Sequence, residues 1–114
     1  MLHIREEQLA AMRQSRRDAF VQRAAVHLRA TRRGAAAMEE EALTEHVRRA
    51  IDHAATYGVV AEEDIVRFAA LTLRLGPSFD TDGNHAWAVS LLRSQLPAAQ
   101  KLSAIGDLLR PRKR

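Results

Sequence analysis

The chain has 114 residues, a length that suits one domain able to bury roughly two-thirds of its unfolded surface. It contains no cysteine, which excludes disulfides and thiolate metal sites, and no apolar run approaches the ~20 residues of a membrane span. Its net charge of +4 is segregated: residues 1–33 carry eight arginines and three acids, residues 34–109 carry six basic and eleven acidic residues, and residues 110–114 add four basic residues. The N-terminus has no apolar signal core, so we expect a cytoplasmic protein whose basic ends pack on its acidic middle or face an acidic partner or nucleic acid.

Residues 4–32 predict a long first helix, because they contain neither glycine nor proline. An apolar stripe begins at Leu9 and Met12 and becomes stronger from Phe20 to Leu28. Because the stripe is weak before residue 19, we expect the first half of this helix to project from the core or to meet a partner.

Residues 39–58 predict the clearest amphipathic helix of the chain, after a break at residues 33–38. Three glutamates open it, and Gly58 suits its end. Only a short joint at residues 59–60 separates it from the next helix, so the two helices are expected to form a helical hairpin.

Residues 62–75 predict the central helix of the domain. Three acids begin it, Gly76 suits a left-handed cap, and Pro77 prevents continuation. Its apolar residues occupy two sides: Ile65, Phe68, Ala69, Thr72 and Leu75 on one, and Val66, Ala70 and Leu73 on the other. Only Arg67 and Arg74 form a polar stripe, and a helix that is apolar over most of its circumference lies inside a bundle.

A loop at residues 76–86 precedes a fourth helix that begins near Trp87. Pro97 fits the first turn of a short fifth helix. The apolar face of this fifth helix is formed by Leu102, Ile105, Leu108 and Leu109.

These elements predict an all-α fold, a single small bundle of four to five helices around the central helix 62–75. We expect one domain at residues 1–109, followed by a basic mobile tail at residues 110–114. The expected core consists of Phe20, Leu28, Leu43, Val47, Ile51, Tyr57, Ile65, Phe68, Leu71, Leu75, Phe79, Trp87, Leu91 and Leu92.

No stretch carries a strong catalytic, metal or nucleotide motif. Asp80, Asp82 and Asn84 place oxygen ligands at alternate positions, but the glycine and glutamate of a calcium loop are not at their positions, which favours a polar turn. His46 and His53 are about 10 Å apart along a helix, too far for one zinc ion. We therefore expect no enzymatic activity and no catalytic, cofactor-binding or metal-ligating residues.

The first half of the first helix has the features of a partner-binding surface. They are Leu9, Met12, Arg13, Arg16 and Arg17. An apolar strip ringed by arginine is typical of protein interfaces, where methionine and arginine are enriched. The strip either binds another protein or completes the bundle. Nucleic acid is the competing partner, through the basic ends, although no basic patch is interleaved with stacking aromatic residues.

Three groups of residues carry a resemblance to a known family. They are residues 1–8 (MLHIREEQ) with 20–23 and 27–29, residues 55–76, and residues 79–82 (FDTD) with 87–92 (WAVSLL). In them the chain resembles small helical proteins of Gram-negative bacteria that are encoded beside type VI secretion spike and effector genes. It departs from them at residues 34–37, where a proline or aromatic residue is typical, and at Ala61, where a Ser or Thr cap is common.

The resemblance implies an accessory role in an effector module. We expect a non-enzymatic adaptor or chaperone that binds a type VI effector or spike-tip protein. Two alternatives remain open: an immunity protein that blocks a toxin, and a nucleic-acid-binding protein that uses the basic N-terminal helix and C-terminal tail. The oligomeric state is open as well.

Overall fold

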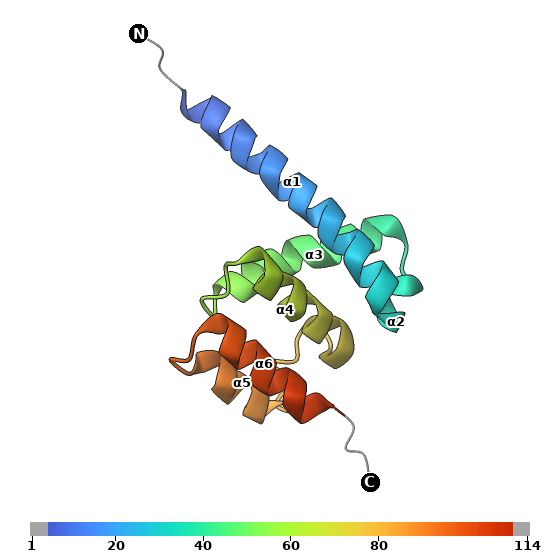
Figure 1. Ribbon diagram of the computed structural model, residues 1–114, viewed down its shortest axis with the longest axis vertical. Coiled ribbons are helices and arrows are strands. Elements are labelled where there is room, and N and C mark those ends of the chain that lie inside the picture. Colours follow the sequence, from blue (N-terminus) through green and yellow to red (C-terminus); the bar gives the residue numbers. More distant parts are fainter. Residues whose placement is uncertain (1–4, 111–114) are drawn as a thin grey trace.

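The computed structural model describes residues 5–110. Residues 1–4 and 111–114, which include the expected start of the first helix and most of the expected basic tail, lie outside the described range. The described residues form six helices: α1 (Glu6–Thr31), α2 (Arg33–Ala36), α3 (Glu40–Ala55), α4 (Glu62–Leu75), α5 (Ala86–Arg93) and α6 (Ala98–Leu109) (Figure 1). The predicted all-α bundle is confirmed, and none of these six helices is long and apolar enough to cross a membrane.

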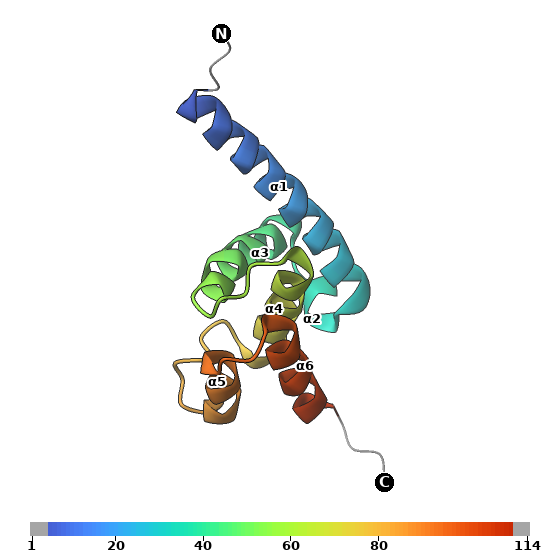
Figure 2. The same cartoon turned by 60° about the vertical axis from the view of Figure 1, so that its left-hand side comes forward.

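Only the second half of α1 is packed. Its buried residues all lie between Phe20 and Leu28, whereas the first half projects from the other helices in both views (Figures 1 and 2). The radius of gyration of 16.0 Å therefore exceeds the about 13 Å expected of a domain of this size. The weak apolar stripe before residue 19 thus corresponds to a helix half with no covering element among residues 5–110.

The centre of the fold is α4, which packs against α1, α2, α3 and α6. Phe68 and Ala69 are fully buried in it. Its bounds are the predicted ones, because local signals set both ends. Three acids occupy the first turn, and the Gly76 N–H donates to the Thr72 carbonyl at 3.0 Å. The hairpin prediction is also supported, since α3 and α4 make the most extensive helix–helix contact in the fold.

Most of the expected core is confirmed. Four of its members are half-buried at the edge of the core: Ile51, Tyr57, Leu75 and Leu91. Trp87 is a correction, because its side chain is 38% exposed. It lies in α5, which packs chiefly against α6 and buries only Ala88 and Leu92. Leu91 of the same helix is half-buried, whereas the side of α5 that carries Trp87 is exposed among the described residues.

Three smaller differences from the predictions concern the break at residues 33–38 and the helix α6. The break at residues 33–38 contains the short helix α2, whose Ala35 is fully buried. Pro97 is the N-cap of α6 and not part of its first turn. Leu108, expected on the apolar face of α6, is 63% exposed, whereas Leu102 and Ile105 of the same helix are buried.

Substitution of Gly76 and Gly106 tests whether the end of α4 requires the backbone conformation that glycine provides. Gly76→Ala is expected to destabilise the protein by about 1–3 kcal/mol, because its φ of 103° with ψ of 151° is accessible essentially to glycine alone. Gly106→Ala, inside α6, is expected to stabilise it by about 0.5–1 kcal/mol. An added Cβ meets nothing within 4 Å at either position, so the contrast isolates backbone conformation. Urea denaturation measures both effects, and a stabilising Gly76→Ala would contradict the observed cap geometry.

Candidate functional site

The predicted partner-binding residues lie on the projecting half of α1. Met12 is 49% exposed, Leu9 is half-buried, and Arg13 and Arg16 are exposed. Neither Leu9 nor Met12 belongs to the core cluster or packs against it. The structure therefore places this apolar strip outside the bundle that the rest of the chain forms.

Arg17 has a different position from the other arginines of the strip. Its Nη2 donates to both carboxylate oxygens of Asp52 at 3.2 Å and reaches the Arg48 carbonyl at 3.5 Å. Six residues further along α1, Arg23 Nη2 lies 3.1 Å from the Glu62 carboxylate. Arg17 thus marks the point where α1 meets α3, and the freely exposed part of the helix ends just before it.

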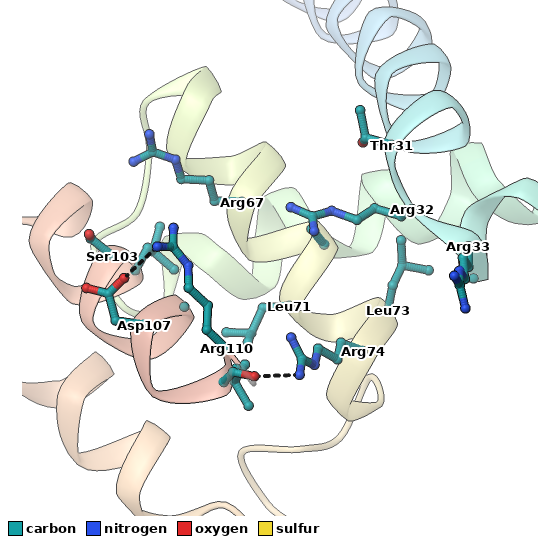
Figure 3. Close-up of a pocket in the computed structure, with 15 residues that line it drawn as sticks. Thr31, Arg32, Arg33, Arg67, Leu71, Leu73, Arg74, Ser103, Asp107 and Arg110 are labelled. Atoms are coloured by element: carbon teal, nitrogen blue, oxygen red, sulfur yellow. Dashed lines mark hydrogen bonds and ion pairs between the residues drawn. The ribbon is translucent and has the colours of Figure 1, made fainter. Parts of the chain in front are cut away.

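A groove of about 700 Å³ opens between the end of α1, α2, α4 and α6 (Figure 3). Its apolar lining includes Ala70, Leu71 and Leu73 of α4 with Leu102 and Leu109 of α6. Five arginines line it as well: Arg32, Arg33, Arg67, Arg74 and Arg110. The groove therefore combines an aliphatic floor with guanidinium groups from three separate parts of the chain.

Three of these arginines have partners within the chain. Arg74 Nη2 donates to the Leu109 carbonyl at 2.7 Å, which closes one end of α6 against α4. The Arg110 guanidinium lies 3.7 Å from the Asp107 carboxylate. The Arg67 guanidinium lies 3.7 Å from the carboxylate of Asp64, one turn earlier in α4. Asp107 is the one acidic residue among those that line the groove, so positive charge prevails there.

Arg32 and Arg33 are exposed, and neither forms an ion pair with another residue of the described range. Figure 3 shows Arg32 extending from the end of α1 toward α4, with Arg110 on the opposite side of the groove. The two guanidinium groups thus face one groove from opposite walls.

A half-buried polar cluster of His53, Tyr57 and Asp80 joins the end of α3 to the loop that follows α4. Asp80 Oδ2 accepts hydrogen bonds from His53 Nε2 at 2.7 Å and from the Tyr57 hydroxyl at 2.5 Å. A carboxylate can only accept, so His53 carries its proton on Nε2. The His53 ring packs edge-on against Phe68 with 5.0 Å between ring centroids, and the Phe79 ring lies 6.0 Å from Phe68 and 6.2 Å from His53.

The surroundings of this cluster shift the pKa values of two of its members. Burial raises the pKa of Tyr57, and the hydrogen bond to Asp80 raises it further, to about 12. Burial by itself would raise the pKa of Asp80 also. The hydrogen bonds from Tyr57 and His53 outweigh that effect and hold the pKa of Asp80 below its ordinary 3.8. The arrangement stabilises an ionised carboxylate and fixes the loop to α3.

The polar turn at residues 80–84 and the two histidines of α3 make hydrogen bonds within the chain. Asp82 Oδ1 accepts a hydrogen bond from the Asn84 backbone N–H at 2.8 Å, as the predicted polar turn requires. His46 Nε2 lies 2.8 Å from Thr72 Oγ1, while His53 faces Asp80, so the two imidazoles have different partners. Within residues 5–110, no group of three His, Cys, Asp or Glu side chains could hold a metal ion.

Sequence reasoning identified the strip on α1 but not the groove or the cluster around Asp80. Part of the groove was visible, since Arg67 and Arg74 form the polar stripe of α4 and Ala70 and Leu73 form its second apolar side. No periodicity relates them to Arg32 or to α6. His53 and Tyr57 share a face at i, i+4, but nothing local places Asp80 beside them.

Comparison of the chain with protein-family models, with curated proteins and with solved structures gives no match.

Proposed function

We propose that this chain is a non-enzymatic interaction protein that binds another protein through the projecting half of α1. The observation that carries the proposal is the strip of half-buried Leu9 and exposed Met12, which is flanked by Arg13 and Arg16 and lies outside the core. Methionine and arginine are enriched at protein interfaces. A preformed helix also presents them with little ordering cost on binding.

The partner we propose is an effector or spike-tip protein of a type VI secretion system, for which this chain acts as an adaptor or chaperone in the cytoplasm. The resemblance in three parts of the sequence supports this partner class. The arginines beside the strip favour a partner surface with an apolar groove edged by acidic residues. An immunity protein that blocks a toxin would use the same strip, and the identity of the bound protein distinguishes the two roles.

Leu9→Asp combined with Met12→Asp is expected to abolish partner binding and to leave the melting temperature nearly unchanged. Each substitution adds a charge to an apolar contact in the complex, whereas exposed sites alter folding stability by only about ±0.5 kcal/mol. Adding Arg13→Glu and Arg16→Glu should slow association, and more strongly at low salt, because charge steers the encounter. Surface plasmon resonance with purified products of the neighbouring genes measures both effects.

Val26→Asp is the matched control, since Val26 is 70% exposed on the packed half of the same helix. It should leave binding intact. If the Leu9 and Met12 substitutions unfold the isolated protein, the strip belongs to the core and the proposal fails. A DNA shift assay at two salt concentrations tests the other class of partner. Tight DNA binding that persists in moderate salt, without a protein partner, would favour a nucleic-acid-binding function.

A further inference from the structure

We propose that the groove between α1, α4 and α6 binds an acidic peptide segment that also carries leucine-like side chains. The inference goes beyond the proposed function, because the groove and the strip on α1 share no residue. If both surfaces are used, the protein holds two polypeptides at once, which is the arrangement an adaptor requires.

The floor of the groove selects for aliphatic side chains. Leu73 and Leu109 line it and are only half-buried, so apolar surface remains available to a ligand. None of the residues that line the groove is aromatic, so nucleic-acid bases would find no stacking surface there. A volume of about 700 Å³ falls within the range of ligand pockets and is much larger than a single phosphate needs.

The rim of the groove selects for carboxylates spread along a chain. Guanidinium groups bind carboxylates through two parallel hydrogen bonds. Here they come from opposite walls, with Arg32 at the end of α1 and Arg110 after α6. The C-terminal ends of α4 and α6 also meet at the groove, where the negative ends of their dipoles disfavour one compact anion. An extended or helical acidic segment can reach several arginines without concentrating its charge at those ends.

The probe for this inference is a fluorescently labelled synthetic peptide of about three helical turns. It has leucine at positions i, i+3, i+4 and i+7 and glutamate elsewhere, the pattern of a helix that lies in a groove. Fluorescence anisotropy should give saturable binding to the parent protein. Arg32→Glu with Arg110→Glu should weaken binding by at least about tenfold, and so should replacing the peptide leucines with serine.

The matched control is Arg13→Glu with Arg16→Glu, which makes the same change of charge on the projecting half of α1. It should alter peptide affinity by no more than about twofold at moderate salt, because exposed distant charges are screened. Arginines near helix C-termini also stabilise the helices themselves. Thermal melts of every variant therefore accompany the binding data, and Arg32→Gln with Arg110→Gln replaces the charge reversal if that variant unfolds.

Several results would overturn the inference. They are an absence of saturable binding, equal weakening by the groove and control variants, and equal affinity for the leucine and serine peptides. Displacement of the peptide by oligothymidylate would indicate a nucleic-acid site, and displacement by millimolar inorganic phosphate an anion site. If sedimentation shows self-association that is lost on Arg32→Glu, the occupant of the groove is a second copy of the chain.

Loss of binding to the partner of the α1 strip bears on the proposed function alone, because the two experiments use different variants and different ligands.

Discussion

Replacing Phe68 with alanine is expected to lower the free energy of unfolding by about 3–5 kcal/mol. Phe68 is fully buried in the central helix, and its ring lies among those of His53, Tyr57 and Phe79. Truncation removes apolar contacts from all three and leaves a cavity that the surrounding helices can fill only in part. For a chain of this length the melting temperature should fall by at least about 10 °C.

Leu108→Ala provides the control for this measurement, because Leu108 is also a large apolar residue but is 63% exposed. It should change stability by no more than about 0.5 kcal/mol. Urea denaturation at neutral pH measures both variants. If Phe68→Ala were as stable as the parent, the central position of α4 would be wrong.

Replacing Asp80 with alanine is expected to destabilise the protein by about 1–3 kcal/mol at neutral pH, because His53 and Tyr57 then lose the acceptor of their hydrogen bonds. Asp80→Asn should have a smaller effect, since the amide oxygen can still accept one of these bonds. Tyr57→Phe is the matched variant from the other side of the network. A double-mutant cycle of Asp80→Ala with Tyr57→Phe measures the coupling between the two groups.

The hydrogen bonds to Asp80 also make the free energy of unfolding depend on pH in the acid range. The pKa of Asp80 is lower in the folded state than its ordinary 3.8, so the unfolded chain binds the proton more readily. The stabilisation is therefore present above about pH 3.8 and is lost as the pH falls through the lower folded-state pKa. The stability difference between the parent and Asp80→Asn should accordingly shrink in that acid window. A constant difference down to pH 2 would contradict the assignment.

Tyr57 provides a direct optical test, because it is the only tyrosine in the chain. Its tyrosinate absorbance should titrate with a midpoint near the raised pKa of about 12. In Asp80→Asn the midpoint should move toward the ordinary 10.0 and stay above it, because burial is the largest cause of the shift. Far-UV circular dichroism at the same pH values establishes that the chain is still folded. Identical midpoints for the two proteins would show that Asp80 does not contribute to the shift.

The features that local chemistry controls could be predicted from the sequence. The bounds of α4 follow from three acids at its start, Gly76 at its end and Pro77 beyond, each of which acts on neighbouring backbone groups. For the first half of α1 the sequence left two outcomes open, and the structure shows the projecting one, in which a weak apolar stripe gains little from docking. That Leu9 and Met12 bind a partner stays a prediction.

Which apolar sides are covered and which polar groups meet depends on how the helices pack against one another. Periodicity shows that Trp87 and Leu108 are apolar positions, but their exposure depends on whether another helix lies over them. Asp80 meets His53 and Tyr57 across more than 20 residues of chain, and Arg32 and Arg110 face one groove although most of the described chain lies between them. Local propensity carries no information about such pairs, because only the packing of helices that are distant in the sequence brings them together.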